Sequence, residues 1–358
     1  MTRALISLCA VCLLACALPS TASAGSLKAI WGPLDMPDGS PAFRVYEELG
    51  VQVVQMQLRW ADTAPSRPAH PADPSDPAYR WPKNVDDAVR AGRRHGIRVA
   101  LLVNAPPRWA NGGRAERWAP NDADYARFLT AASRRYRSVR LWMVWGEANR
   151  AAVFQPLPEN SPVGPRRYAT LLNGAYKALK RRSRGNIVIG GMTFSFGAVM
   201  PRDFLRWMRL PGGRPPPLDW YGHNPFTRRF PNLRHRGFPG YPAARDISDI
   251  DTFADEVRGT YRPKYRAFRK HEPKLWLSEF TVSSDRPNRW FDFYVSRAQQ
   301  ARWLSAAYRI ARRAPYVAGL GWIGLVDEPV TQPRGTTTGL MTYEGRRKPA
   351  YYAYQRAR

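Results

Sequence analysis

Two glutamates follow apolar segments that lie far apart in the chain. Glu147 ends a run that begins at Leu141, and Glu279 ends a run that begins at Leu275. Carboxylates are rarely placed beside buried apolar residues without a partner or a use. If the two groups face each other, one can hold a proton for a leaving oxygen while the other attacks a carbon, which is what cleavage of a glycosidic bond requires. A structural ion pair is the alternative interpretation of either glutamate alone.

The elements that must position these glutamates follow a regular pattern. Eight short apolar runs alternate with arginine-rich amphipathic stretches, which is typical of parallel strands joined by crossover helices. Eight such units predict a closed (β/α)8 TIM barrel, and no G-x-G-x-x-G follows the first run, which disfavours an open dinucleotide-binding sheet. The expected strands are 27–32, 51–60, 97–104, 139–147, 186–194, 218–224, 274–281 and 317–325, and the expected helices include 84–95, 122–137, 165–182, 251–270, 297–313 and 348–358.

Period-two alternation predicts which neighbours share a side with each glutamate. Because the side chains of a strand point alternately to its two faces, Glu147 is expected on the side of Trp145. Glu279 is expected on the side of Leu275 and Leu277. Both of these sides are expected to face the inside of the barrel, so that the two carboxylates meet at its rim.

Other candidate site residues stand where the expected strands end, because barrels of this kind carry their functional groups at the carboxyl ends of the strands. Polar groups and flat aromatic faces suit a sugar. Candidate substrate-binding residues are Arg59, Asn104, Asn149, His223, Asn224 and Trp322. The alternatives are a solvated arginine, a satisfied core histidine and indoles that fill the core. Asp327 and Glu328 are expected to be solvated loop charges.

The second run shows how such a barrel would be lined. An apolar set should pack under the helices, while a polar set should point inward, where each group needs a partner. The two sets are Val54, Met56, Leu58 and Gln55, Gln57, Arg59.

The motifs around both glutamates resemble those of clan A glycoside hydrolases. The sequence WGEAN at 145–149 is similar to the W-N-E-P-N signature of that clan, and WLSEF at 276–280 is similar to its nucleophile strand. The resemblance extends over nearly all of residues 25–358 and places an aromatic platform at Trp322. It implies a retaining double displacement with Glu147 as acid/base and Glu279 as nucleophile, their carboxyl groups about 5–5.5 Å apart.

Two positions depart from the clan's pattern. Gly146 stands where an asparagine normally binds the sugar's 2-hydroxyl, so that contact comes from Asn104, Asn149 or Asn224, or is absent. This departure implies an unusual sugar or a slow enzyme. In addition, relatives often end the sixth strand with H-x-Y, whereas here His223 is followed by asparagine and proline.

The first 24 residues have the features of an export signal. A basic tip precedes the apolar run 4–18, which is too short to span a bilayer, and small residues follow at 21–24. We expect residues 1–24 to be a cleaved signal peptide and residues 25–358 to form one catalytic domain that is secreted. The alternative is a lipobox that ends at Cys16 and leaves a lipid-anchored envelope protein. All three cysteines lie in this segment, so no disulfide is expected in the exported domain.

The formal net charge of +28 is the most unusual global property. Such a field attracts polyanions, so an anionic polysaccharide is a candidate partner, with compositional bias as the alternative. The arginines are spread over all expected helices and no nucleic-acid motif is present, so no nucleic acid is expected as partner. The five histidines are scattered without metal-ligand spacing, so no metal or cofactor is expected. Two further hypotheses are an inactive glycan-binding barrel and a basic polyanion-binding envelope protein.

Overall fold

The computed structural model describes residues 25–234, 237–268, 272–287, 292–329 and 335–357. The expected signal peptide, with its lipobox and its cysteines, lies outside these residues. Within the described part of the chain, no helix combines the length and the apolar character needed to cross a bilayer.

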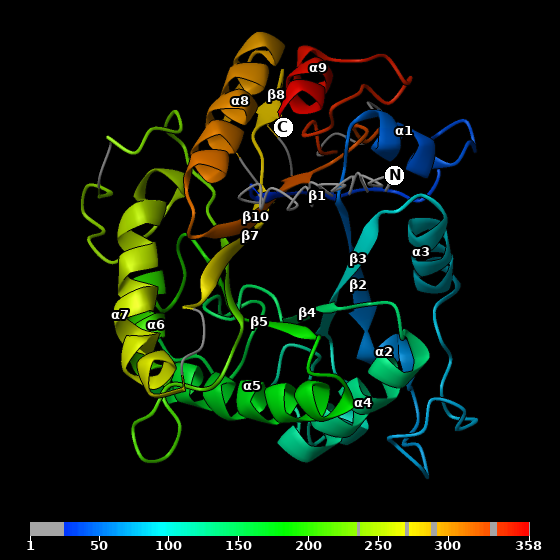
Figure 1. Cartoon of the computed structure of the whole chain (residues 1–358), viewed down its shortest axis with the longest axis vertical. Coiled ribbons are helices and arrows are strands. Elements are labelled where there is room, and N and C mark those ends of the chain that lie inside the picture. Colours follow the sequence, from blue (N-terminus) through cyan, green and yellow to red (C-terminus); the bar gives the residue numbers. More distant parts are fainter. Residues whose placement is uncertain (1–24, 235–236, 269–271, 288–291, 330–334, 358) are drawn as a thin grey trace, which may run out of the picture.

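Eight parallel strands close into a barrel in the order β1, β10, β7, β6, β5, β4, β3, β2. Each neighbouring pair runs parallel around the whole circle (Figure 1). The prediction of a (β/α)8 barrel is therefore confirmed, and each of the eight expected runs contains one barrel strand. The strands are β1 (Leu27–Trp31), β2 (Val53–Arg59), β3 (Arg98–Asn104), β4 (Leu141–Val144), β5 (Ile187–Phe194), β6 (Trp220–Asn224), β7 (Lys274–Phe280) and β10 (Val317–Ile323). A separate two-stranded ladder joins β8 (Ser283–Ser284) and β9 (Tyr294–Val295).

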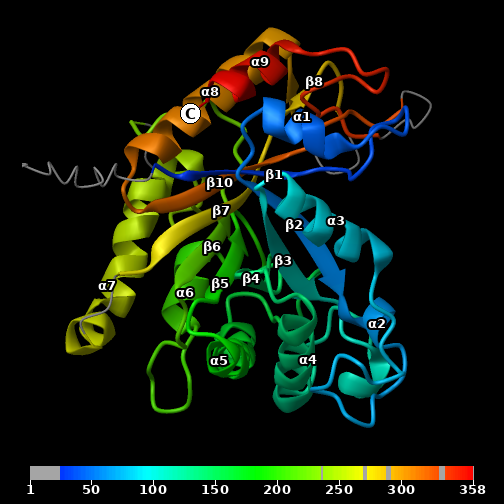
Figure 2. The ribbon, with the colours of Figure 1, turned by 45° about the vertical axis from the view of Figure 1, so that its right-hand side comes forward.

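Helices surround the strands in both views of the molecule (Figures 1 and 2). Local signals fix their ends: Asn121 caps α4, Ser296 and Gln299 form a capping box on α8, and Gly96 follows α3 with φ 65°. The helices are α1 (Ala42–Glu48), α2 (Trp60–Thr63), α3 (Lys83–Arg94), α4 (Asp122–Arg135), α5 (Val163–Arg182), α6 (Pro201–Trp207), α7 (Ile250–Phe268), α8 (Arg297–Arg313) and α9 (Pro349–Arg356), with 3-10 turns at Arg108–Ala110 and Ile247–Asp249.

The barrel separates two apolar clusters. The larger one lies between strands and helices, and the smaller one fills the inside of the barrel. On β2 the apolar residues 54, 56 and 58 belong to the outer cluster, as predicted. Gln55 points inward, where its amide donates to the carbonyl of Ser278 at 2.8 Å and accepts from the Trp276 indole at 3.1 Å. The inward polar group is therefore satisfied, as burial requires.

Three neighbours of the glutamates do not lie where alternation placed them. Trp145 belongs to the outer cluster, because β4 ends at Val144 and the backbone turns to φ 65° at Trp145. On β7, Leu275 and Leu277 also pack outside the barrel, whereas Trp276 points inward. The predicted faces of these three residues are therefore wrong, although both glutamates still reach the rim.

Asp327 is buried, which corrects the prediction of a solvated loop charge. Nζ of Lys348 lies 3.1 Å from each of its carboxylate oxygens, and the lysine side chain is fully buried. Burial raises the pKa of Asp327 and lowers the pKa of Lys348. This ion pair joins the segment after β10 to the residue that precedes α9.

Candidate active site

Glu147 lies on a tight turn that directly follows β4. Trp145 and Glu147 both have positive φ, 65° and 43°, which is rare for residues with a side chain. Neighbouring strands hold this conformation: the backbone N–H of Trp145 donates to Val103 at the end of β3, and that of Ala148 donates to Met192 in β5. The turn therefore points the Glu147 carboxylate over the barrel rim instead of continuing the strand.

Asn149 fastens the same turn to β5. Its side-chain amide donates to the carbonyls of Phe194 and Val199 at 3.0 Å, and its oxygen accepts from the Phe194 N–H at 2.7 Å. The side chain is completely buried. Asn149 was predicted to bind substrate, but its polar atoms are occupied by backbone partners, so its position in the structure is that of a fastener of the Glu147 turn.

Glu279 reaches the rim because β7 carries one extra residue. Leu277 pairs with Leu320 and Phe280 with Trp322, so β7 advances three residues while β10 advances two. Such a bulge re-aims side chains and is frequent beside functional sites. Ser278 points inward to Gln55, and Phe280 has already returned to the outer cluster. Without the extra residue, alternation from the inward Trp276 would turn Glu279 away from the barrel.

Asn224, at the end of β6, joins the two carboxyl groups. Its side-chain amide donates to Oε1 of Glu147 at 3.2 Å, and the same side chain lowers the pKa of the Glu279 carboxyl. Among the described residues, Oδ1 of this fully buried asparagine has no hydrogen-bond donor. Burial, and after it the charge of Glu147, raises the pKa of Glu279 to about 8, while Arg150 and Asn224 act in the opposite direction. The effect of the Glu147 charge on Glu279 fits the prediction that both glutamates lie at one rim; their separation of 5–5.5 Å stays a prediction.

Arg150 is the cation that the structure adds to this pair. Its guanidinium forms an ion pair with Oε2 of Glu147 and lies over the Phe194 ring, 4.8 Å from the ring centroid. The arginine side chain is 38% exposed and that of Glu147 15%. Sequence reasoning missed Arg150 because it followed the strand alternation and did not consider the turn, in which residues three apart come together.

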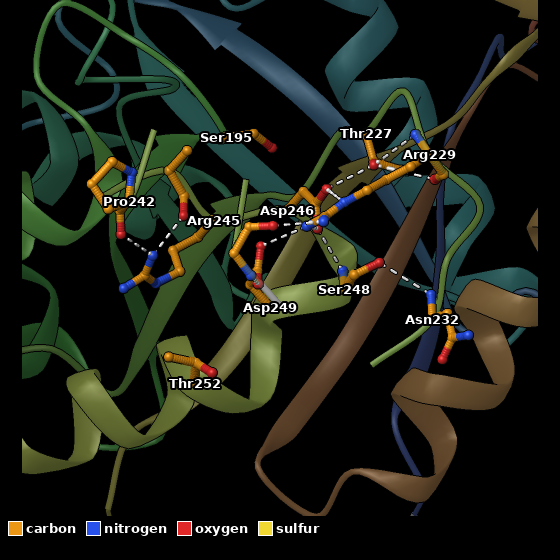
Figure 3. A network of polar contacts seen from close by, with 12 residues as sticks. Ser195, Thr227, Arg229, Asn232, Pro242, Arg245, Asp246, Ser248, Asp249 and Thr252 are labelled. Atoms are coloured by element: carbon orange, nitrogen blue, oxygen red, sulfur yellow. Dashed lines mark hydrogen bonds and ion pairs between the residues drawn. The ribbon is translucent and has the colours of Figure 1, made fainter. Parts of the chain in front are cut away.

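A polar network supports the segment that follows Asn224. The guanidinium of Arg229 contacts both oxygens of Asp246, at 2.9 and 3.2 Å, and Asp249 at 3.0 Å (Figure 3). The hydroxyl of Thr227 also donates to Asp246 at 2.7 Å. Because Asp246 is 1% exposed, this network is shielded from water and holds the loop between β6 and α7 in one arrangement.

Ser195 connects that loop to β5. Its hydroxyl lies 3.0 Å from the Asn224 carbonyl oxygen and 2.8 Å from that of Phe226. The backbone at Asn224 is thus fixed from two sides, which fixes the direction of its side chain toward the glutamates.

His223 does not face the site, which corrects its prediction as a substrate-binding residue. Its Nδ1 lies 2.9 Å from the Thr193 hydroxyl and its Nε2 lies 3.0 Å from the Arg245 carbonyl. The imidazole packs against Phe253 of α7, and burial lowers its pKa to about 4. The alternative of a satisfied core histidine is therefore the correct one, because both ring nitrogens have partners outside the barrel.

Arg59 and Asn104 lie at the ends of β2 and β3 but contact neither glutamate in the described contacts. Arg59 pairs with Asp62 at 2.8 Å and with Glu116 at 2.6 Å. The Asn104 side-chain oxygen accepts from Gln57 at 2.8 Å. Both side chains are partly exposed and stay candidate substrate contacts beyond the central pair.

Trp322 is fully buried in the outer cluster, which corrects its prediction as an aromatic platform. Its indole N–H donates to the Thr338 carbonyl at 2.9 Å, and its ring packs edge-on against Phe280. No face of the ring is open to a sugar. The indole at the rim is Trp31, which is partly exposed, packs on the inner cluster and donates to the Ser278 carbonyl at 3.2 Å.

Gly146 is in a restricted space. A β-carbon at this position would lie 3.1 Å from a terminal carbon of Leu102 inside the barrel. Any side chain here would first meet β3, so the 2-hydroxyl contact expected from an asparagine at this position is better assigned elsewhere. Because Asn149 is occupied, Asn224 and Asn104 are the remaining candidates.

No group of three or more histidine, cysteine or acidic side chains with a metal-binding arrangement occurs among the described residues. The groups that the site presents are two carboxyl groups, one amide and one guanidinium.

The structure is a closed parallel barrel with Glu147 and Glu279 near the carboxyl ends of β4 and β7. Comparison with solved structures finds the same fold in a family 39 glycoside hydrolase from the gut symbiont Bacteroides cellulosilyticus WH2, at a TM-score of 0.66 and 19% identity over 94% of this chain and 64% of that one. The family 39 enzyme from Xanthomonas axonopodis pv. citri has a TM-score of 0.63 and 17% identity, over 92% of this chain and 65% of that one. A monomeric beta-xylosidase from Caulobacter crescentus CB15 has a TM-score of 0.56 and 19% identity, over 93% of this chain and 68% of that one.

These similarities show the barrel fold that the clan A resemblance implied. The chain spans about two thirds of the length of these solved chains. No protein-family model matches the sequence, and no curated protein matches it.

Proposed function

We propose that this protein is a retaining O-glycosidase. The observation that carries the proposal is the placement of Glu147 and Glu279 after β4 and at the end of β7, where Asn224 bonds Glu147 and the charge of Glu147 acts on Glu279. The shared fold with family 39 glycoside hydrolases supports it.

The proposed reaction has two displacements. Glu279, ionised, attacks the anomeric carbon while Glu147 gives its proton to the leaving oxygen. Glu147 then takes a proton from water, which attacks the glycosyl–enzyme ester and releases Glu279. Asn224 holds the pair in place and is the candidate partner for the sugar's 2-hydroxyl.

The charges of the ligand-free site have a consequence for this reaction. Burial and the charge of Glu147 raise the pKa of Glu279 to about 8, so the two carboxyl groups together hold one proton at neutral pH. Attack requires this proton on Glu147 and an ionised Glu279. Two coupled carboxyl groups titrate as a pair, so the proton that they share is available to Glu147 when substrate binds.

We further propose that the protein acts outside the cytoplasm on a polysaccharide or glycoconjugate, with the lipid-anchored form as the alternative. The export features of residues 1–24 support this proposal. Mass spectrometry of the mature protein distinguishes the two forms: cleavage after residue 24 gives a free amino terminus, and cleavage before Cys16 gives a lipidated cysteine.

The experiment that tests the glycosidase is a screen of aryl glycosides, followed by proton NMR of the first sugar released. Wild-type protein is expected to give product with the anomeric configuration of the substrate, and Glu279→Ala is expected to abolish turnover. Inverted product would reject the double displacement. If no glycoside or polysaccharide is hydrolysed but glycans are still bound, the hypothesis of an inactive glycan-binding barrel would be favoured.

A second candidate function, polyanion binding, is favoured by a groove on the flank of the barrel. A cavity of about 910 Å³ lies between the segment 230–234 and α8. It is lined by apolar residues and by five arginines, and no acidic side chain is among its described lining residues; the arginines are Arg234, Arg302, Arg309, Arg313 and Arg356. Closely spaced guanidinium groups attract an acidic polysaccharide.

Binding of polygalacturonate, with neutral dextran as control, tests this second function. The combined Arg302→Gln, Arg309→Gln and Arg313→Gln variant is expected to bind polygalacturonate more weakly and with less salt dependence. Glu147→Gln is expected to bind it as the wild type does. Equal binding by all three proteins would reject the groove as the binding surface.

A further inference from the structure

Arg150 has no part in the proposed double displacement, although its guanidinium touches the proposed proton donor. It lies on the same turn, three residues after Glu147, and its plane rests near the Phe194 ring. A guanidinium above an aromatic ring keeps its N–H edge free to bind a carboxylate in a bidentate way. At 38% exposure, this side chain can be reached by a ligand at the rim.

The contact with Glu147 opposes the proposed chemistry as long as it persists. Proton delivery needs the neutral form of the acid, whereas an adjacent positive charge favours the ionised form. A ligand that supplies another anion to Arg150 would remove this opposition. A neutral sugar offers no such group.

We propose that Arg150 is a specificity-determining residue that binds an anionic group on one of the two sugars flanking the scissile bond, and that this contact releases Glu147 for proton delivery. The inference rests on the proposed glycosidase function and names its substrate class, glycosides of acidic sugars. Carboxylated and sulfated sugars share the required chemistry.

The step that follows is an internal proton transfer. When the substrate anion replaces Glu147 as the partner of Arg150, the proton that the two carboxyl groups share moves to Glu147. The pair carries one proton before and after, and Glu279 is left ionised for attack. The neutral Glu147 no longer repels charge on Glu279, so the transfer favours the ionised nucleophile.

Arg150 is the positively charged residue that acts on the pair Glu147 and Glu279. Among the described residues, the charged groups that act on Glu279 are Glu147 and Arg150. The neighbouring strand β6 contributes the uncharged Asn224, and β5 contributes Phe194. Arg59, at the end of β2, is already paired with two acidic side chains.

The test compares matched substrates on the full chain. An aryl glycoside, its 6-carboxylate and its 6-sulfate are assayed with wild type and Arg150→Gln, together with an oligosaccharide that carries a uronic acid on the leaving side. Wild type is expected to prefer one acidic substrate, and Arg150→Gln to lose about 10- to 100-fold of this preference, measured as the ratio of kcat/KM on the acidic and the neutral substrate. Which acidic substrate is preferred identifies the anion and its sugar.

A matched control is Arg202→Gln, which removes one positive charge from a side chain of similar exposure, 35%, that pairs with Asp203 on α6. It is expected to leave the preference for the acidic substrate unchanged. The pH profile adds a readout that a purely structural role would not move. On the neutral substrate, the basic limb of kcat/KM in Arg150→Gln should shift to higher pH, because the guanidinium that lowers the pKa of Glu279 is absent.

Two failures are distinguishable. If wild type hydrolyses neutral glycosides as well as acidic ones, and Arg150→Gln changes both equally, the inference about Arg150 is overturned while the glycosidase stands. If no glycoside is hydrolysed, the proposed function fails, and calorimetric titration with the free uronic acid decides about Arg150. Binding that is present in wild type and lost in Arg150→Gln supports the anion site, and equal binding refutes it.

Discussion

The side-chain amide of Asn224 donates a hydrogen bond of 3.2 Å to the carboxylate of Glu147, although 77 residues separate them in the chain. Asn224 also lowers the pKa of Glu279. One side chain on β6 therefore holds the carboxyl group on the turn after β4 and acts on the carboxyl group of β7. The predictions below follow from this arrangement and from the buried charges that surround it.

Asn224→Ala is expected to lower kcat about 10- to 100-fold, because Glu147 loses the amide that positions its carboxyl group. Steady-state kinetics on an aryl glycoside measures the effect. Asn186→Ala is the matched control: Asn186 is also a buried asparagine, but its amide bonds the Leu179 carbonyl on the helical side of β5. That variant should lose stability and keep kcat. Equal losses of kcat in both variants would contradict a positioning role for Asn224.

Glu147→Gln should reduce the rate strongly on glycosides with poor leaving groups and weakly on those with activated phenols. The reason is that an acid catalyst is needed only when the leaving oxygen must be protonated to depart. A plot of kcat/KM against the pKa of the leaving phenol, for wild type and variant, provides the measurement. Glu279→Gln should instead fail on all of them. A Glu147→Gln variant that is insensitive to the leaving group would argue for another proton donor.

The raised pKa of Glu279 makes stability depend on pH. Between pH 4.5 and about 8 the unfolded chain has released this proton while the folded chain still holds it, so the free energy of unfolding falls as pH rises across this window. The effect is on the order of 4 kcal/mol. Glu279→Gln, which cannot ionise, should remove this decline and be more stable than wild type above pH 8. Urea unfolding at pH 5 and pH 8.5 measures the difference, and parallel behaviour of the two proteins would refute the assignment.

Lys348→Met is expected to lower the free energy of unfolding by about 3–5 kcal/mol, because Asp327 would remain buried without its cation. Replacing both partners, with Asp327→Leu added, should recover much of the loss. Lys83→Met is the control: its side chain is 88% exposed and pairs with Asp87 on the surface of α3, so the change should stay within about 1 kcal/mol. Urea unfolding of the four proteins provides the values. No difference between the two single lysine variants would refute the buried pair.

His223 should stay neutral throughout the working range of the protein. Burial lowers its pKa to about 4, so between pH 4 and 6.5 the unfolded chain binds a proton that the folded chain does not, and this residue makes stability rise with pH in that window. Titration of the ring signals by NMR measures the pKa directly. A midpoint near 6.5 would mean that the ring is exposed to solvent, contrary to its two hydrogen bonds.

Much of the fold was predictable because the burial of strands and helices in a parallel barrel produces a simple pattern of apolar residues in the sequence. Apolar runs mark strands that are covered on both faces, and the amphipathic stretches between them mark helices with one face in water. Short helices such as α1 and α6, seven residues each, leave too few turns for a clear periodicity and were not predicted.

The candidate site was predictable only in part. Both glutamates and Asn224 were identified, because they stand at strand ends beside apolar residues. The directions of their neighbouring side chains were not predicted correctly, because alternation assumes a regular strand. The positive φ of Trp145 and the bulge at Glu279 interrupt this regularity. The rule for a strand holds only as far as the strand is regular.

Three predicted ligands became structural residues for a common reason. Asn149, His223 and Trp322 bond carbonyls of segments that are distant in sequence, and no local pattern announces these partners. Arg150 shows the converse, since its importance comes from a turn that brings it back to Glu147. Long-range contacts with backbone carbonyls therefore determine which polar side chains at the strand ends remain free to bind a substrate.

The extra residue between Leu277 and Phe280 of β7 sets the direction of the Glu279 side chain, whereas the closure of the barrel does not depend on it. Removing one residue between Trp276 and Phe280 would leave the register shift between Val317 and Gly319 of β10 uncompensated and turn the carboxylate at 279 toward the helices, while the strand pairs that do not include β7 would be unaffected. We expect a variant with that deletion to keep the barrel and to lose the carboxylate that is proposed as nucleophile. Comparisons of related sequences should therefore align the length of this strand before they count its glutamate as retained.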